Sequence, residues 1–147
     1  MRKFSSYLFD FDGTLVDSMP AFISVMLRIL DDEGIKYERD IIKIITPLGY
    51  GGAADYYINE LGICAEKEEL LCKMQEMAYR EYAFNIPAKE GVIETLRKLK
   101  EEGGNLNILT ASPHSVLDVC LKRLLLSRCL MCMLLIALAM CQTPTEF

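Results

Sequence analysis

The stretch Ser5–Ser18, SSYLFDFDGTLVDS, decides the fold and holds the chemistry that the sequence predicts. Its first part, Ser6–Phe9, is a short apolar run, which is typical of a buried strand. Two acidic residues, Asp10 and Asp12, follow directly and flank Phe11. Residues i and i+2 of an extended chain face the same side. We therefore expect both carboxylates to enter one pocket while Phe11 packs behind them.

Two carboxylates in one pocket need a cation, or one of them must hold a proton. Magnesium, which prefers oxygen ligands, meets this need, so Asp10 and Asp12 are predicted metal ligands. Gly13 allows a tight turn and offers its N–H to an anion, and Thr14 can fix that turn by a side-chain hydrogen bond. The alternative is a helix cap beside a surface turn, but perturbed acid pairs cluster at functional sites.

The region after this stretch has helical spacing throughout. Ser18 is the expected N-cap of a helix whose apolar residues stop at Gly34. A short helix over residues 38–46 is expected to end in a glycine-rich loop, TPLGYGG (46–52). Two further helices are expected over 53–61 and 65–83. Residues 17–84 are therefore predicted to be a helical cap.

A second strand is expected at Leu106–Leu109, after an amphipathic helix within residues 91–104. A helix follows over residues 113–126. Strand, helical insertion, helix, strand and helix predict an α/β fold, with a parallel sheet core and an inserted α-helical cap. The predicted domains are the core (1–16 and 85–126), the cap (17–84) and an atypical apolar tail (127–147).

Reactive groups of open α/β sheets collect beyond the carboxyl ends of the strands. The second strand ends in Thr110-Ala111-Ser112, so this turn is expected beside the two aspartates. A carboxylate can attack phosphorus, and a second acid can protonate the leaving oxygen and later deprotonate water. Thr110 and nearby backbone N–H groups would hold the phosphate oxygens, although Thr110 could instead cap the next helix. Ser112 is expected to be that cap rather than a ligand.

Two motifs resemble those of the haloacid dehalogenase (HAD) superfamily. DFDGTLVDS (10–18) resembles the nucleophile motif of its phosphatases, DxDGTLxDS, and NILTAS (107–112) resembles its second motif. The helical region resembles the cap of the phosphoglycolate phosphatase and β-phosphoglucomutase-like subfamily. The resemblance implies that Asp10 is the nucleophile and a magnesium ligand, and that Asp12 is the acid/base, whose carbonyl also binds the metal.

The same resemblance implies the remaining site residues. The phosphate is expected to contact Phe11, Gly13, Thr110 and Ala111. TPLGYGG falls where such caps carry a substrate-facing loop, which makes Tyr50 and Gly51 candidate specificity residues. The expected function is that of a cytoplasmic Mg²⁺-dependent phosphatase acting on a small phosphorylated metabolite through an aspartyl-phosphate. A phosphomutase of the same superfamily is the alternative.

The later motifs of the superfamily have no match in this sequence. They supply a lysine and an acidic pair, whereas the last acid after Asp118 is Glu146 and Lys122 comes too early. A non-catalytic truncated fragment is therefore a further alternative, and low or no activity is expected. In the family's Rossmann-like sheet the Asp10 strand is central. The resemblance therefore implies an incomplete core here, with one edge of that strand open.

The tail differs in composition from the rest of the chain. Residues 129–141, CLMCMLLIALAMC, contain no polar side chain. As a membrane span this run is short, because spanning takes about 20 residues. A buried strand or helix is a second interpretation. We favour a third, a frameshift or truncation after about residue 123.

The composition of the chain limits the classes of partner that it is expected to bind. The net charge of −5 argues against binding to nucleic acid or to anionic membranes. Six cysteines are present, but only Cys129 and Cys132 have C-x₂-C spacing, and no second pair of this spacing accompanies them to complete a zinc site. The N-terminus meets acidic residues too early for a signal peptide. Reduced thiols in a cytoplasmic protein are expected.

Overall fold

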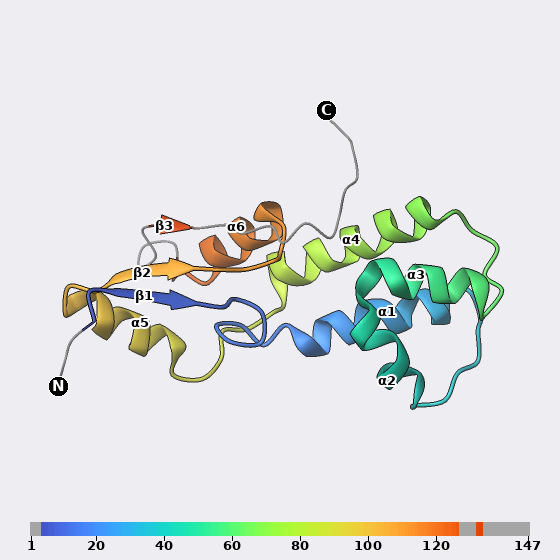
Figure 1. Ribbon diagram of the computed structural model, residues 1–147, viewed down its shortest axis with the longest axis horizontal. Helices are drawn as coiled ribbons and strands as arrows, with labels where there is room; N and C mark the ends of the chain where they lie inside the picture. The colour runs from blue at the N-terminus through green and yellow to red at the C-terminus, as the bar shows by residue number, and fades with distance from the viewer. Residues whose placement is uncertain (1–3, 127–131, 134–147) are drawn as a thin grey trace. The chain divides into compact units, whose positions relative to one another are not determined.

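The computed structural model describes residues 4–126 and 132–133 of the 147-residue chain (Figure 1). The chain divides into two compact units. One comprises Met1–Asp17 and Ile86–Phe147 and the other Ser18–Asn85. We label them the core unit and the cap unit after the domains predicted from the sequence.

The core unit is built on a parallel sheet. Its strands are β1 (Ser6–Phe9), β2 (Asn105–Ile108) and β3 (Cys132–Met133), in the order β1-β2-β3. Tyr7 pairs with Leu106, and Asn107 pairs with Cys132. The first strand has the predicted bounds and the second begins one residue earlier than expected. This sheet and its helices confirm the predicted α/β fold.

Two helices complete the described part of the core unit, and both connect consecutive strands (Figure 1). Helix α5 (Val92–Glu101) is amphipathic, with Leu96 buried and charged residues on its outer face. Helix α6 (His114–Arg123) buries Val116, Leu117, Cys120 and Leu121. Gly104 lies between α5 and β2, where a Cβ atom would stand 2.8 Å from the Tyr7 ring and 2.9 Å from the Leu99 carbonyl oxygen. Only glycine therefore fits this connection without a shift of its neighbours.

The prediction of a buried first strand was wrong. Leu8 is 56% exposed and Phe4, just before the strand, is 71% exposed. Among the described residues, β1 pairs along one edge only, with β2. The rings of Tyr7 and Phe9 stack on one face of the strand, with centroids 6.4 Å apart. The apolar run therefore forms a strand, but little packs against its other face.

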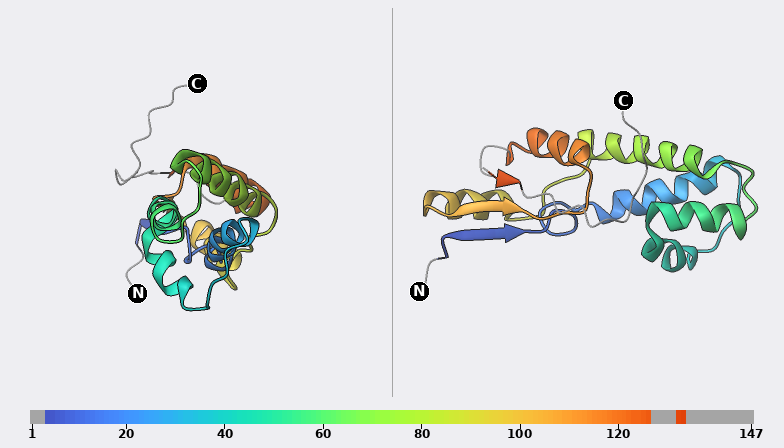
Figure 2. Two further views of the ribbon diagram at one scale, coloured as in Figure 1. Left: turned by 90° about the vertical axis from the view of Figure 1, so that its right-hand side faces the viewer. Right: turned by 45° about the horizontal axis from the view of Figure 1, so that its top comes forward.

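The cap unit is helical (Figure 2). Ser18 is the residue before α1, but its side chain makes no capping hydrogen bond. Helices α1 and α3 both pack on α4. The elements are α1 (Met19–Asp32), α2 (Ile41–Ile45), the 3₁₀ turn η1 (Thr46–Leu48), α3 (Gly49–Asn59) and α4 (Lys67–Phe84).

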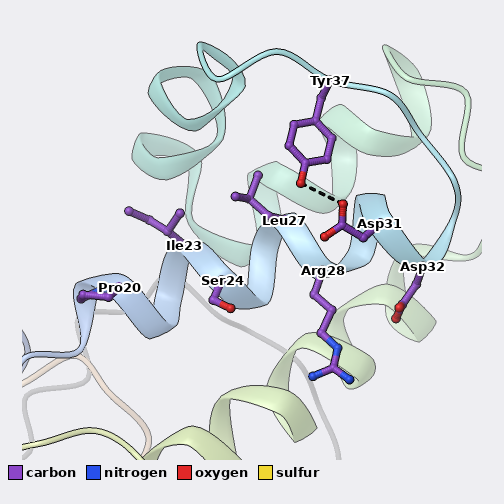
Figure 3. A pocket seen from close by; sticks show the side chains of 8 residues that line it. All are labelled: Pro20, Ile23, Ser24, Leu27, Arg28, Asp31, Asp32 and Tyr37. Atoms are coloured by element: carbon purple, nitrogen blue, oxygen red, sulfur yellow. Dashed lines mark hydrogen bonds between the residues drawn. The ribbon is translucent and has the colours of Figure 1, made fainter.

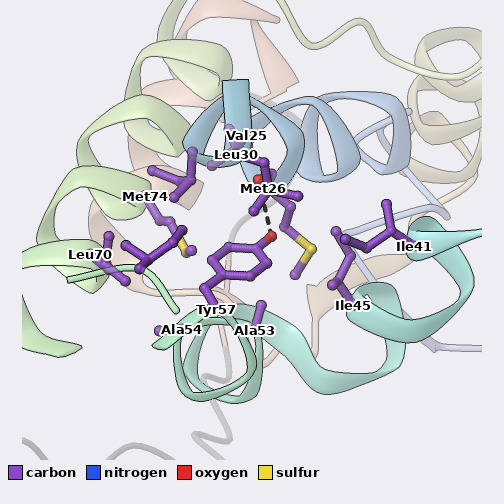
Figure 4. Close-up of a cluster of buried hydrophobic side chains, with 12 residues drawn as sticks. Val25, Met26, Leu30, Ile41, Ile45, Ala53, Ala54, Tyr57, Leu70 and Met74 are labelled. Carbon is purple, nitrogen blue, oxygen red and sulfur yellow. Dashed lines mark hydrogen bonds between the residues drawn. The ribbon is translucent and has the colours of Figure 1, made fainter. Parts of the chain in front are cut away.

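A single hydrophobic cluster fills the cap unit (Figure 4). Tyr57 lies at its centre with no exposed surface, and its hydroxyl donates a 3.0 Å hydrogen bond to the Met26 carbonyl. Burial raises the pKa of the Tyr57 hydroxyl, so this group stays a donor at all ordinary pH values. The other fully enclosed side chains are Met26, Ile29, Leu30, Ile45, Ala53, Ala54 and Met74.

The expected loop over residues 46–52 is not a loop. Thr46–Leu48 forms η1, and α3 begins at Gly49. Gly49 has φ 64°, which turns the chain from one helix into the next. The first N–H groups of any helix lack partners within it, so glycines cost little in this first turn. The stretch GYGG is therefore the first turn of α3.

The tail is described only at Cys132–Met133, which forms β3 beside β2. The other residues of the tail lie outside the described residues. Within the described ranges, no helix is both long and apolar enough to cross a membrane.

Candidate functional site

A tight loop holds the two aspartates at the carboxyl end of β1. The carbonyl oxygen of Phe11 accepts hydrogen bonds from the N–H groups of Leu15 (2.9 Å) and Val16 (3.2 Å). The Phe11 side chain is fully buried, as expected for a residue that packs behind the acids. Gly13 has φ 74°, a conformation that glycine adopts without strain. Asp10 and Asp12 are thus anchored by the backbone between and after them.

The Gly13 N–H already has a partner in this structure. It donates a 2.9 Å hydrogen bond to the carbonyl of Val16. A phosphate contact through this group requires that bond to be exchanged. The phosphate-binding roles of Phe11, Gly13 and Ala111 stay predictions.

Each carboxylate accepts a hydrogen bond from a hydroxyl group. Thr14 Oγ1 donates to Asp10 Oδ2 over 3.3 Å, across one turn of the loop. Ser112 Oγ donates to Asp12 Oδ2, which joins the ends of β1 and β2. Asp10 is exposed and Asp12 is half-buried. The structure therefore brings Asp12 together with the turn that follows the second strand.

The expectation that Ser112 caps the next helix was wrong. Helix α6 has Pro113 at its N-cap position, and no side chain makes a capping hydrogen bond there. Thr110 is not a cap either: it is only 4% exposed, and its Oγ1 accepts a 3.1 Å hydrogen bond from the Ser112 N–H. The sequence held no local signal of this, because a proline after a serine is also common at the start of a helix.

A cationic group lies in the same part of the core unit. Arg123 Nη2 donates to the carbonyl of Ile86 and lies 3.7 Å from Cys120 Sγ. Burial raises the pKa of the Cys120 thiol; the Arg123 guanidinium works against this shift, and the charge of Asp12 adds to it. Cys120 therefore sits within the electrostatic reach of both Arg123 and Asp12.

The two chain segments that lead into and out of the cap unit bond to each other within the core unit. We call residues 15–17 and 87–89 the stem. Val16 forms an antiparallel bridge with Ala88. The other contacts are Asp17 N–H to the Pro87 carbonyl (2.9 Å), Lys89 N–H to the Leu15 carbonyl (3.0 Å), and Lys89 Nζ to Asp17 Oδ1 (3.5 Å).

The donor set fits a magnesium ion held by few protein ligands. Asp10 and Asp12 supply carboxylate and carbonyl oxygens, which are the ligands that Mg²⁺ prefers. No group of three or more His, Cys, Asp or Glu side chains that could hold a metal occurs within the described residues. Magnesium is commonly bound through one or two carboxylates, water and substrate phosphate oxygens, so the smaller set is compatible with it.

The two specificity candidates lie in the cap unit, within α3. The ring of Tyr50 packs on Phe22, with centroids 4.8 Å apart, and both Tyr50 and Gly51 are half-buried. A hollow of about 540 Å³ lies along α1 of the same unit and does not include them (Figure 3). It is lined by Pro20, Ile23, Ser24, Leu27, Arg28, Asp31, Asp32 and Tyr37.

The parallel sheet and the acidic residues after its first strand define an α/β protein. In this class of protein, sites lie beyond the carboxyl ends of the strands. Comparison with known families identifies the family within this class. Residues 7–137 match the haloacid dehalogenase-like hydrolases, and the chain belongs to this family. The resemblance drawn from DFDGTLVDS is thereby confirmed.

Individual proteins agree with this assignment. The pyrophosphatase PpaX of Bacillus velezensis is 29% identical over 124 residues, covering 82% of this chain and 54% of the relative. The chain therefore spans about half the length of this curated relative.

Two solved structures share the fold. A provisionally assigned β-phosphoglucomutase from Thermotoga maritima has a TM-score of 0.79 at 23% identity, over 90% of this chain and 61% of that one. The HAD hydrolase YfnB from Bacillus subtilis, solved bound to magnesium, has a TM-score of 0.75 at 16% identity, over 91% and 66% of the two chains. At these identities the likeness concerns the fold alone.

Proposed function

We propose that this chain carries the nucleophile site of a magnesium-dependent phosphatase that hydrolyses small phosphate esters through an aspartyl-phosphate on Asp10. The observation that supports this most is the meeting of the two strand ends, where the hydroxyl of Ser112 bonds to the carboxylate of Asp12. Thr110, the predicted phosphate contact, is bonded to the same serine. The relative PpaX, a pyrophosphatase, points to the same reaction class.

In the proposed reaction, a carboxylate oxygen of Asp10 attacks phosphorus while the bond from phosphorus to the leaving oxygen breaks. Asp12 gives a proton to that oxygen. A water molecule then attacks the phosphorus of the aspartyl-phosphate and loses a proton to Asp12, and the bond to Asp10 breaks to release phosphate. Thr110 and neighbouring N–H groups stabilise the charge on the phosphate oxygens.

We assign the metal to the Asp10 carboxylate and to Asp12. When bound, magnesium neutralises the repulsion between the carboxylates and the phosphate. YfnB, which shares the fold, was solved with this metal. We further propose that the unit Ser18–Asn85 is the cap, that Tyr50 and Gly51 contribute to specificity, and that the substrate is a small phosphorylated metabolite of the cytoplasm.

The test is capture of a phosphoryl group. The purified chain is mixed with magnesium and acetyl phosphate, and the mass of the Asp10 peptide is followed by mass spectrometry. We expect a phosphorylated peptide that depends on magnesium, is absent in Asp10→Asn and is unchanged in Asp118→Asn, a surface variant on α6. Turnover should be slow, because losing one preorganised stabilising group typically costs about 10²–10³ in rate. Phosphorylation that persists in Asp10→Asn would rule out this nucleophile.

A further inference from the structure

Ser112 joins two sequence segments that both belong to the site. Its N–H donates to Thr110 Oγ1 over 3.1 Å, and its hydroxyl donates to Asp12 Oδ2. Thr110 is nearly fully buried, and Pro113 follows, which restricts the backbone of Ser112 to extended conformations. The serine hydroxyl is therefore presented to Asp12 from a constrained turn.

The two carboxylates differ in how they are held. Asp10 is bonded to Thr14, a residue of its own loop, over a fairly long 3.3 Å. Asp12 is bonded to a residue 100 positions away, at the end of the neighbouring strand. A contact across the sheet holds Asp12 relative to the phosphate-binding turn, which a contact within the loop cannot do.

We propose that Ser112 is a positioning residue that aims the acid/base Asp12 at the oxygen atoms with which it exchanges a proton. This inference rests on the proposed function. A hydroxyl group donates to a carboxylate and accepts from a carboxylic acid. Serine can therefore hold Asp12 both before and after it gives its proton to the leaving oxygen. A lysine at the same position could only donate a hydrogen bond, and would favour the ionised form of Asp12.

The first experiment asks whether the contact exists, and needs no activity. Urea unfolding is measured for Ser112→Ala, Asp12→Ala and the double variant. We expect the effect of Ser112→Ala on the unfolding equilibrium constant to shrink about threefold or more once Asp12 is gone, since residues in contact are energetically coupled. Asp12→Leu, which has a similar shape and no hydrogen-bond acceptor, replaces Asp12→Ala if the latter does not fold. Ser115→Ala, an exposed serine on α6, should show no coupling.

The second experiment separates positioning from a structural role. A p-nitrophenyl phosphate has a leaving group that needs little protonation, whereas an alkyl phosphate needs a proton from Asp12. We expect Ser112→Ala to lower kcat/KM, which reports the step in which the leaving group departs, about tenfold or more for the alkyl phosphate and less than about twofold for the aryl phosphate. Ser112→Thr, which keeps the hydroxyl, should restore the alkyl rate, and Ser115→Ala should leave both rates unchanged.

Each possible result of these experiments supports or overturns the positioning role of Ser112. Absence of coupling overturns the inference whether or not Asp10 is phosphorylated. Coupling with equal slowing of both substrates makes the contact purely structural and also overturns it. If wild-type Asp10 accepts no phosphoryl group, the proposed function fails and the positioning role falls with it, even where the coupling survives.

Discussion

The cap unit and the core unit are stabilised in different ways. In the cap unit, helices that are near one another in sequence enclose a complete cluster around Tyr57. In the core unit, the pairing of β1 with β2 joins residues about a hundred positions apart, as in the hydrogen bond from Asn107 to the Tyr7 carbonyl. Local contacts form at a lower entropic cost than distant ones. The proposed catalytic residues thus lie in the unit whose contacts form at the higher entropic cost.

The largest expected effect tests the cap unit. Tyr57→Ala removes a fully buried ring together with its hydrogen bond to the Met26 carbonyl. We expect the free energy of unfolding to fall by about 3–5 kcal/mol. Urea denaturation followed by circular dichroism measures it. Tyr79→Ala, a tyrosine 44% exposed on α4, should cost less than about 0.5 kcal/mol. Equal costs would contradict the closed cluster.

A smaller effect tests the core unit. Gly104→Ala places a Cβ atom 2.9 Å from the Leu99 carbonyl oxygen, a backbone group that cannot easily move. Overpacking of this kind costs about 1–3 kcal/mol. Gly51→Ala in α3 meets nothing within 4 Å and should be neutral or stabilising by up to about 1 kcal/mol. Thermal melts of the two variants compare them, and a stable Gly104→Ala would show that this part of the core unit is loosely packed.

The exposed strand should affect association more than stability. Leu8→Lys changes a side chain that is 56% exposed, so the free energy of unfolding should change by less than about 0.5 kcal/mol. Among the described residues β1 has a neighbour on one edge only, and charged residues on edge strands discourage pairing between molecules. Light scattering of the wild type should rise with concentration, and that of Leu8→Lys should not. Equal scattering would show that the molecules do not associate through the open edge of β1.

The smallest effect concerns one thiol. Burial raises the pKa of Cys120, so little thiolate forms at neutral pH, whereas Cys64 and Cys72 are exposed. Because the thiolate is the reactive form, iodoacetamide should modify Cys120 at least about tenfold more slowly than the other two. Peptide mapping after timed alkylation measures each rate. Comparable rates would mean that the core unit opens around α6 far more readily than its packing indicates.

The predictions from sequence succeeded where one periodicity governed a segment. The apolar run Ser6–Phe9 gave the bounds of β1, and the pattern of 53–61 located the helix that became α3. They failed where glycine was taken to mean a loop: GYGG lies in the first turn of α3, where glycine is tolerated. Burial of β1 was also misjudged, because an apolar run does not reveal how many neighbours a strand has.

For the site, the sequence predicted where the acids lie but missed what holds Asp12. Asp10 and Asp12 were identified from their place after a strand. Ser112 was taken for a helix cap, since serine is common there. Its true partner lies 100 positions away, a distance at which single-sequence patterns carry no information. The metal ligands and phosphate contacts remain predictions.

The stem has a consequence for how such a protein changes over generations. Because residues 15–17 and 87–89 bond to each other, the insert leaves and re-enters the sheet-bearing unit at one place. Insertions whose ends lie close together disturb the host little. Most of the bonds in the stem are between backbone groups, so they do not depend on which insert is present. A different helical insert could therefore be joined at the stem while the aspartate loop stays in register.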